Sequence, residues 1–305
     1  GEQCNRRTRA GPLWLETCAW PSRLVRILKV SYPKARIELL WQAHRGQTAS
    51  SIAAGLGVEL RVVKDWELVD LVLLDTGVND AYEATVYWNS GEASADPGTV
   101  VSIAYEVLVR SLKELLPRAV LVPVTAGCAR CLEMRPRHLE VAAHYGLPVA
   151  DFGSVTAKRP QLWDPPEWTH PRAPTHQLVA DTVAGTWSRA LREGRGRPLP
   201  PPASLPAASF HTQEELDKFS PCLKPLSGYM ASVAFNDPSA PRPATANGWR
   251  LFEDRPKKPG WIAEEEGATM SFDLAFGPTP QFAIIYLRSY EGLGDMTVNM
   301  GGKSA

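Results

Sequence analysis

The stretch VDLVLLDTGVND, residues 69–80, decides the fold and the place of the chemistry. Its first half, residues 69–74, is apolar except for Asp70, which is typical of a short strand buried on both faces of a sheet. Its second half, DTGVND, brings polar groups and a glycine directly after that strand. Because ligands of parallel sheets bind at the carboxyl ends of the strands, we expect this segment to face the ligand site.

Other strand-like runs alternate with helical patterns through the first two thirds of the chain. Apolar runs of strand length lie at residues 37–41, 119–124 and, more weakly, 148–152. Apolar positions spaced three and four residues apart predict helices at residues 20–30, 100–116, 136–145 and 175–191. Short buried strands separated by helices predict an α/β fold, with a parallel sheet covered by helices on both faces.

The composition changes in the tract EGRGRPLPPPASLP, residues 193–206, which is rich in proline and predicts an extended spacer. Behind it, residues 268–276 alternate apolar and polar side chains, and residues 282–287 and 296–300 are further strand candidates between Gly/Pro turns. We therefore expect three parts: an α/β domain over residues 1–191, a linker over 192–206 and an antiparallel β-sandwich over 207–305.

Charge and cysteine content exclude several classes of protein. The chain has 33 basic and 33 acidic residues, and this zero net charge argues against a protein that coats nucleic acid or an anionic membrane. No apolar run approaches the roughly 18–20 residues that cross a bilayer. The five cysteines are too few for a disulfide scaffold. Cys128 and Cys131 form a CxxC pair without a second ligand pair, so zinc is weakly supported, and free or bridged cysteines are both open.

Three loops carry candidate chemistry. After the strand at 69–74, the Asn79 amide could donate to a developing oxyanion, with Gly77 and Asp80 supporting the turn, although GxND alone also fits an Asx turn. In the segment EWTHP, Glu167 lies three residues before His170, the spacing of an acid that orients a base, although a lone histidine before proline is more often structural. Gly46, in the loop after the run at 37–41, could offer its N–H to the same oxyanion.

Taken together, these three loops resemble the SGNH hydrolase superfamily, also called GDSL esterases and lipases. The family block GxND matches Gly77, Asn79 and Asp80; a strand-end glycine block is similar to Gly46-Gln47-Thr48; and DxxHP resembles residues 167–171. The resemblance covers residues 1–190 and implies a three-layer, flavodoxin-like parallel sheet. It also implies His170 as general base, Glu167 as its orienting acid, and Asn79 and Gly46 as oxyanion donors, with no metal or organic cofactor.

Two departures from the family pattern affect this interpretation. Glu167 stands where the family has aspartate. The block GDSxxxG, whose serine is the nucleophile, is not found; Gly1 fits its last glycine, which places the serine and the preceding strand upstream of Gly1. Cys4 is a weaker alternative nucleophile. The chain from Gly1 onward is therefore expected to show no serine-type turnover.

The expected function is hydrolysis of acyl esters, either carbohydrate acetyl esters or lipids, with a small-molecule or polysaccharide ester as the partner. The alternative is a non-catalytic carbohydrate-binding or adhesion protein on a degenerate hydrolase scaffold. An acyltransferase using the same residues is a third, weaker option. A secretory route follows only from the habit of the family, and the sequence leaves the oligomeric state open.

Overall fold

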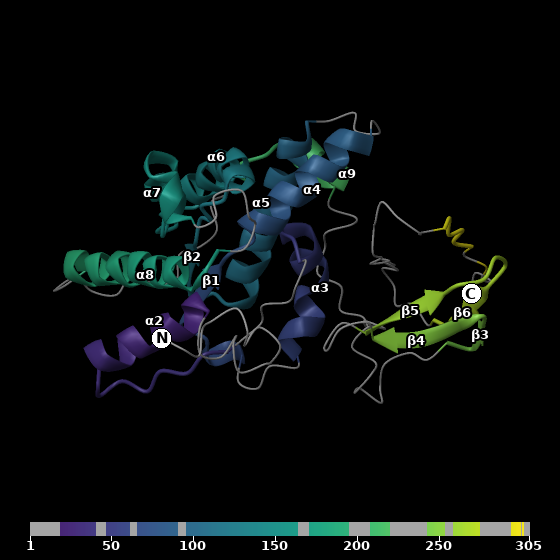
Figure 1. Ribbon diagram of the computed structural model, residues 1–305, viewed down its shortest axis with the longest axis horizontal. Helices are drawn as coiled ribbons and strands as arrows, with labels where there is room; N and C mark the ends of the chain where they lie inside the picture. Colours follow the sequence, from purple (N-terminus) through teal and green to yellow (C-terminus); the bar gives the residue numbers. More distant parts are fainter. Residues whose placement is uncertain are drawn as a thin grey trace.

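The structure is a computed structural model in which α-helices surround a short parallel sheet (Figure 1). It describes residues 19–40, 47–61, 66–90, 96–163, 171–194, 208–219, 243–253, 259–274, 294–299 and 301. The helices of the α/β part are α2 (Trp20–Ser31), α3 (Ala49–Arg61), α4 (Gly77–Ser90), α5 (Pro97–Leu115), α6 (Ala129–His144), α7 (Phe152–Lys158) and α8 (Ala173–Gly194). Short 3-10 turns lie at Trp66–Leu68 and Pro160–Leu162.

The sheet forms from the two strongest apolar runs of the sequence. Strand β1 (Leu71–Leu74) pairs in parallel with β2 (Val120–Pro123), with Leu71 opposite Val120. Both strands lie within the predicted runs, so these two predictions are confirmed. The weaker run at 148–152 contributes one parallel bridge, from Ala150 to Val124, before α7 begins. The described part therefore has the mixed α/β architecture with a small parallel sheet that the sequence predicts.

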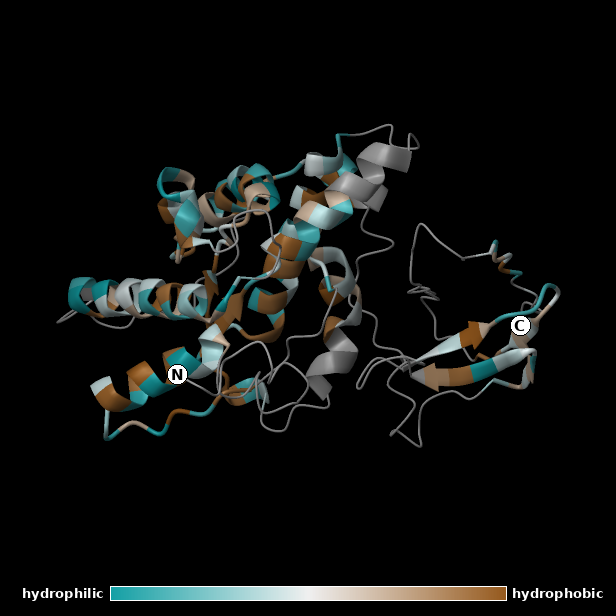
Figure 2. Cartoon of the chain, in the orientation of Figure 1, coloured by the Kyte–Doolittle hydropathy of each residue, from teal (hydrophilic) through white to brown (hydrophobic). Residues whose placement is uncertain are grey.

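Helices cover both faces of this sheet, because successive strand side chains point to opposite sides. On β2, Leu121 belongs to a core cluster with α3, α5 and α6, whereas Val122 belongs to a second cluster with α2 and α8. Helices α2 and α8 lie side by side on one face, and α5 lies among α3, α4 and α6 on the other (Figure 1). Hydrophobic residues concentrate where α5 meets the sheet (Figure 2).

The four helices that the sequence predicts begin close to their predicted positions, with one clear difference, while α3, α4 and α7 were not predicted. Helix α5 starts where the Asp96 carboxylate accepts a hydrogen bond from Thr99 N at 3.0 Å, an N-terminal cap, with Pro97 at the first helical position. Helix α6 begins at Ala129, seven residues before the predicted start at Pro136. Its interior therefore contains Pro136, although proline removes one helical N–H donor. The apolar periodicity alone did not predict the first two turns.

One predicted strand is wrong. Residues 37–40 of the run at 37–41 have no regular structure, and Leu39 and Leu40 are 40% and 46% exposed. A strand needs a neighbour for its backbone hydrogen bonds, and no described strand pairs with this run. The apolar composition of this run was therefore not sufficient to predict a strand.

The described residues after the proline-rich tract form two separate arrangements. Residues 208–219 include α9 (Gln213–Phe219), which packs on α5, although we predicted that residues from 207 onward belong to the C-terminal domain. Farther along, β3 (Thr245–Asn247) pairs with β6 (Thr269–Ser271), and β4 (Trp249–Glu253) pairs with β5 (Pro259–Ala263), both antiparallel. These strands lie away from the parallel sheet (Figure 1). The division into three domains stays a prediction.

The predicted β-sandwich is only partly visible. The alternating run at 268–276 forms strand only over Thr269–Ser271, and residues 294–299, inside the candidate 296–300, have no regular structure. Met296 and Val298 are exposed, so they lack the packing that stabilises a strand. The candidate at 282–287 lies outside the described residues.

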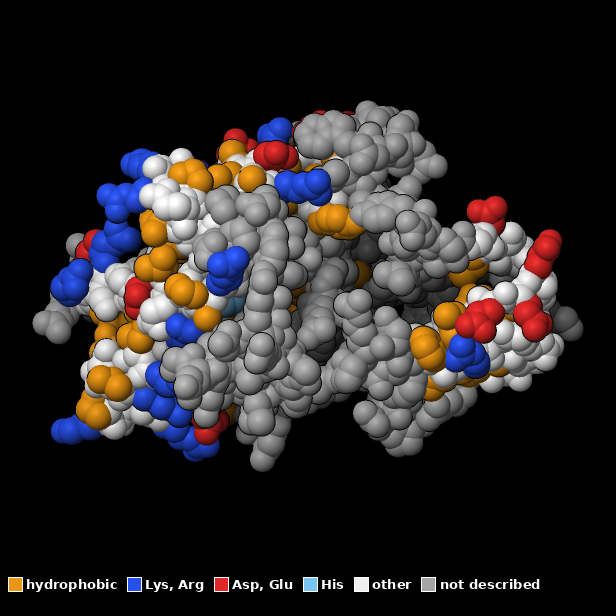
Figure 3. Space-filling view, in the orientation of Figure 1, with side chains coloured by type: hydrophobic (Ala, Val, Ile, Leu, Met, Phe, Trp, Pro, Cys, Tyr) orange, Lys and Arg blue, Asp and Glu red, His pale blue; other side chains and the backbone are white. Residues whose placement is uncertain are grey.

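Charged side chains lie mostly on the surface, and Lys and Arg gather over α2, α7 and α8 in Figure 3. Within the described residues, no helix is long and apolar enough to cross a membrane. Two acidic residues are exceptions: the side chains of Asp80 and Glu106 are fully buried. Buried carboxylates need partners, so their surroundings decide what these residues do.

Candidate functional site

The motif GVND forms the first turn of α4, directly behind β1. The backbone N–H groups of Asn79 and Asp80 both donate to Thr76 O at 3.0 Å, which closes this turn. The motif therefore lies at the carboxyl end of the parallel sheet, where ligands bind in open α/β folds.

Gly77 does not play the part that the sequence suggested. We expected it to allow a tight turn, but it lies in a helix, and the described glycines with positive φ are Gly146, Gly248 and Gly267. A Cβ at position 77 would meet Ala126 Cβ at 3.7 Å, an ordinary contact. Asp75 and Thr76 join β1 to α4, and the helix begins at Gly77, so Gly77 and Asp80 belong to its first turn.

Asn79 and Asp80 connect this helix start to the segment before α3. Asn79 Nδ2 donates to Gln47 O at 2.7 Å, and Asp80 Oδ1 accepts from Ala49 N at 2.7 Å. An asparagine amide has two N–H donors, so the Gln47 carbonyl occupies one and fixes the orientation of the other. The structure thus brings the GxND motif and the segment after Gly46 together, although they are about thirty residues apart in the sequence.

Behind Asp80 lies a buried histidine that sequence reasoning missed. His138 Nε2, on α6, is 3.0 Å from Asp80 Oδ2. The His138 ring stacks on Tyr105 of α5, with ring centroids 4.2 Å apart. Burial, followed by the nearby carboxylates of Asp80 and Asp75, raises the pKa of the Tyr105 hydroxyl, so the phenol stays neutral. The side chains of Asp80 and His138 are 0% and 6% exposed, so both are shielded from water.

Asp75, the first residue after β1, adds an exposed carboxyl group at this end of the sheet. Its Oδ2 accepts a hydrogen bond from Trp20 Nε1 at 3.0 Å, which ties the start of α2 to the end of β1. Burial of the carboxyl raises the pKa of Asp75 to about 6, the Trp20 bond opposes this, and the charge of Asp80 adds to it. Asp75 keeps exposed surface, so water screens part of this effect.

Glu83, one turn after Asp80 on α4, is the third carboxyl of the group. Its Oε1 accepts from the Ser50 hydroxyl at 2.8 Å. Burial raises the pKa of Glu83, and the hydrogen bond from Ser50 partly opposes this. Three carboxyls therefore crowd the carboxyl end of β1, and we call Asp75, Asp80, Glu83, Tyr105 and His138 the site cluster. Among the described residues, no group of three or more His, Cys, Asp or Glu side chains could hold a metal ion.

The start of α8 approaches the site cluster through α2. Arg23 Nη1 of α2 donates to Gln177 Oε1 of α8 at 3.1 Å, one turn along α2 from the Trp20 bond to Asp75. The Thr175 hydroxyl donates to Leu162 O at 2.9 Å, which fixes α8 against the chain before residue 164. The ends that flank residues 164–170 are thus held on the side of the sheet that carries Asp75.

Three of the predicted site residues lie outside the described residues. These are Gly46, Glu167 and His170. Their placement relative to Asn79 is not given by the described structure, so their roles stay predictions. Asn79, Gly77 and Asp80 are described, and of these Asn79 and Asp80 make the contacts that join the two loops.

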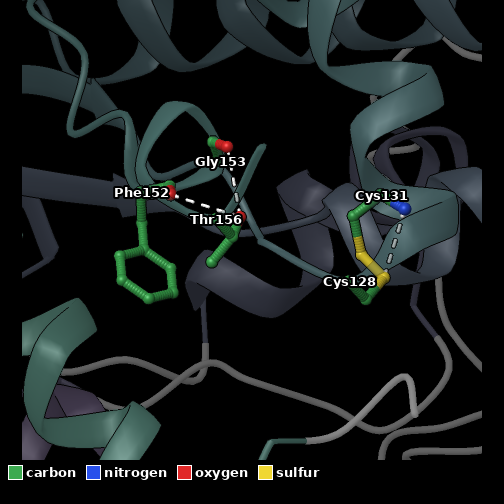
Figure 4. The surroundings of a disulfide bond; sticks show 5 residues. All are labelled: Cys128, Cys131, Phe152, Gly153 and Thr156. Atoms are coloured by element: carbon green, nitrogen blue, oxygen red, sulfur yellow. Dashed lines mark hydrogen bonds between the residues drawn. A yellow bond between two sulfur atoms is a disulfide. The ribbon is translucent and has the colours of Figure 1, made fainter. Parts of the chain in front are cut away.

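The CxxC pair is a disulfide between Cys128 and Cys131, behind β2 (Figure 4). Cys128 is the N-cap of α6, and its sulfur accepts from Cys131 N at 3.1 Å. A Cβ at the neighbouring Gly127 would lie 2.5 Å from Thr156 Oγ1, so only glycine fits between this loop and α7. The disulfide and this close approach fix the loop at the same end of the sheet as the site cluster.

Sequence reasoning missed His138 because its signal is three-dimensional. The residue lies in the middle of a helix, 58 positions after Asp80, with no motif around it. Asp75 had a local signal, since it directly follows a buried strand. Glu83 had a weaker one, its position one helical turn after Asp80.

No protein-family model and no curated protein sequence matches the chain. Two solved structures are similar to it. One is LAE5, an α/β hydrolase from the metagenome of Lake Arreo, Spain, at 16% identity and a TM-score of 0.45, covering 56% of this chain and 82% of that one. The other is a two-domain esterase (CEX) active on acetylated mannans, at 18% identity and a TM-score of 0.48, covering 83% of this chain and 61% of that one. At these TM-scores neither likeness supports an inference about activity.

Proposed function

We propose that the protein is an ester hydrolase of the SGNH type, acting on acyl esters of carbohydrates or lipids. The observation that carries the proposal is the contact between Asn79 Nδ2 and Gln47 O at 2.7 Å. It joins the GxND motif to the loop behind Gly46, the two segments whose N–H groups would stabilise an oxyanion. A preorganised donor of this kind is the largest single contribution in many acyl-transfer enzymes.

In the proposed reaction, a serine nucleophile attacks the acyl carbon while His170 takes the serine proton. The second N–H of Asn79 and the N–H of Gly46 donate to the resulting oxyanion. The tetrahedral intermediate then expels the alcohol, which takes its proton from His170. Water attacks the acyl-serine by the same steps and releases the acid. Glu167 would accept a hydrogen bond from His170 and orient its ring.

The described part supports this assignment in a second way. Residues 164–170 are flanked by segments that connect through Gln177, Arg23 and Trp20 to Asp75, four residues before Asn79. The proposal requires His170 to reach the carboxyl end of β1.

The test is hydrolysis of p-nitrophenyl acetate by the full-length protein. We expect Asn79→Ala to lower kcat by about 10²–10³-fold, the effect of losing one oxyanion donor. His170→Ala should abolish turnover, and Asn247→Ala, in the exposed strand β3, is the matched control that should leave kcat unchanged. Equal rates for Asn79→Ala and Asn247→Ala would contradict the proposal. Carbohydrate binding without any turnover would favour the non-catalytic alternative.

A further inference from the structure

We propose that His138 is a positioning residue for the oxyanion site, which it holds in place through Asp80. The inference rests on the proposed function, because the group finally positioned is the Asn79 amide. His138 itself touches neither the substrate nor the reacting atoms in this proposal. Its task is to fix one carboxylate that connects three helices.

The first step is the place of Asp80 between those helices. Asp80 is on α4, its Oδ1 accepts from Ala49 N at the start of α3 at 2.7 Å, and its Oδ2 lies 3.0 Å from His138 Nε2 on α6. Neither Oδ2 nor Nε2 has a hydrogen bond to any described residue, so their 3.0 Å approach is a close polar contact without hydrogen-bond geometry. Asp80 Oδ2 and His138 Nε2 are therefore each other's nearest polar contact, and a substitution of His138 is expected to affect Asp80 first.

The second step is the rigidity of His138. Its side chain is 6% exposed, and its ring is stacked against Tyr105, which is 1% exposed. A ring held on one face by an aromatic neighbour, and enclosed by the core, has little freedom to rotate. Met134, one turn earlier on the same helix, is buried in a cluster with Ala81 and Ala84 of α4. Helices α4 and α6 are thus packed together at the point where the pair forms.

The third step runs from Asp80 to the proposed oxyanion donors. Ala49 N is two residues from the Gln47 carbonyl, and that carbonyl holds Asn79 Nδ2. Release of Asp80 from Ala49 would therefore free the segment that orients the Asn79 amide and carries Gly46. Catalytic groups tolerate little displacement, since a misplacement of about 1 Å can cost roughly 10²-fold in rate.

Two variants with the same amide group test the proposal. The amide nitrogen of His138→Gln reaches about as far as Nε2, so it can keep the polar contact with Asp80 Oδ2, whereas the amide of His138→Asn is one methylene shorter and cannot. We expect His138→Asn to lower kcat by about 10-fold or more with KM nearly unchanged, and His138→Gln to keep most of kcat. Val141→Ala, on the same helix and fully buried, is the control for a general loss of core packing.

A second measurement reports the contact without using activity. We expect the Ala49 amide to exchange with deuterium at least ten times faster in His138→Asn than in the wild-type protein, measured by NMR. The Leu116 amide, which donates to Leu112 O at the C-terminal end of α5 and lies outside residues 47–49, is the internal control and should keep its rate. This readout works at any temperature at which the variant is folded, as judged by circular dichroism.

The outcomes separate the two proposals. Active wild-type protein, with kcat the same in His138→Asn as in Val141→Ala, would overturn the positioning role and leave the esterase proposal standing. Unchanged exchange at Ala49 in His138→Asn would overturn it as well. Inactive wild-type protein would end the esterase proposal, and the exchange rate of Ala49 would then decide alone whether His138 holds Asp80 and its segment in place.

Discussion

Two histidine–carboxylate pairs are buried around α5, and they are built differently. Asp80 and His138 form the pair at the carboxyl end of β1, while Glu106 of α5 pairs with His211, which precedes α9. Tyr105, which stacks on His138, is the residue directly before Glu106. Successive helix residues project about 100° apart, so one turn of α5 serves both pairs on different sides.

The pair around Glu106 is the better satisfied. Glu106 Oε1 accepts from the Tyr145 hydroxyl at 2.5 Å and from Phe210 N at 2.7 Å, and Oε2 accepts from His211 N at 2.9 Å and His211 Nδ1 at 2.6 Å. Burial by itself would raise the pKa of Glu106, but these hydrogen bonds lower it to about 2. This carboxylate is fully partnered, and it attaches residues 208–219 to the α/β part.

In the site cluster, the pKa values of two carboxyl groups are raised, whereas that of Glu106 is lowered. Burial raises the pKa of Asp75 to about 6 and also raises the pKa of Glu83, because few hydrogen bonds compensate the loss of water. Carboxyls crowded in this way at a strand end are typical of functional sites, whereas a carboxylate with four donors is typical of a structural attachment. We infer that Glu106 stabilises the fold and that the site cluster is arranged for chemistry.

The largest expected effect tests the structural half of this comparison. An amide offers one acceptor oxygen where the Glu106 carboxylate offers two, and hydrogen bonds to a charged group contribute about 1.5–3 kcal/mol each. Glu106→Gln should therefore lower the free energy of unfolding by about 3–5 kcal/mol, measured by urea denaturation at pH 7. Below its unfolding transition the variant should hydrolyse esters at the wild-type rate. A loss of kcat in the folded variant would contradict the assignment of a purely structural role to Glu106.

The same variant should show a defined pH dependence. Since the folded-state pKa of Glu106 is below its ordinary value of 4.5, its contribution to stability is present above about pH 4.5 and is lost as the pH falls toward about 2. The difference in unfolding free energy between wild type and Glu106→Gln should therefore shrink between pH 5 and pH 3. A difference that grows in this interval would show that the Glu106 carboxylate is not held ionised.

The sequence could predict the sheet because its strands are strong local signals. The runs at 69–74 and 119–124 are nearly all apolar and lie on both sides of a helical pattern, so their parallel pairing follows from general rules. The run at 37–41 looked similar but has no described strand beside it. Strand pairing depends on two segments, so the sequence of one segment does not show whether it has a partner strand.

The candidate site could be predicted only where its residues follow a strand. Asn79 was found because GxND is compact in the sequence and follows β1 directly. His138, Tyr105 and Glu106 were not found, because each is recognised as part of a polar or stacked pair only through its contact partner. These partners lie between about 30 and 105 residues away in the sequence. In all three, the helical pattern predicts burial of the helix face, and burial alone does not distinguish a core residue from a polar pair.

A smaller effect is expected from the Cys128–Cys131 disulfide. It closes a very short loop, so the entropy removed from the unfolded chain corresponds to about 2 kcal/mol. Cys128→Ser with Cys131→Ser should lower the free energy of unfolding by about this amount, because the hydroxyl introduced at position 128 can still cap α6. His138 lies two turns farther along α6, so kcat should not change. A loss of kcat as large as in His138→Asn would show that the disulfide, and not the Tyr105 stack, fixes the site cluster.

The smallest expected effect concerns Asp75, and its sign is opposite to that of Glu106. Because the folded-state pKa of Asp75 is raised to about 6, ionising it costs stability, and this cost grows from about pH 4 to pH 6 and is then constant. In Asp75→Asn, the amide oxygen can still accept from Trp20 Nε1 and the cost is absent. The variant should therefore be more stable than wild type at pH 8 and no more stable at pH 4, measured by urea denaturation. Asp70→Asn, exposed just before β1, is the control for the exchange of a carboxylate for an amide at this end of the chain segment. If Asp75→Asn were less stable than wild type at pH 8, the Asp75 carboxylate would belong with Glu106 as a structural group, and the contrast between the two regions would narrow to Asp80 and His138.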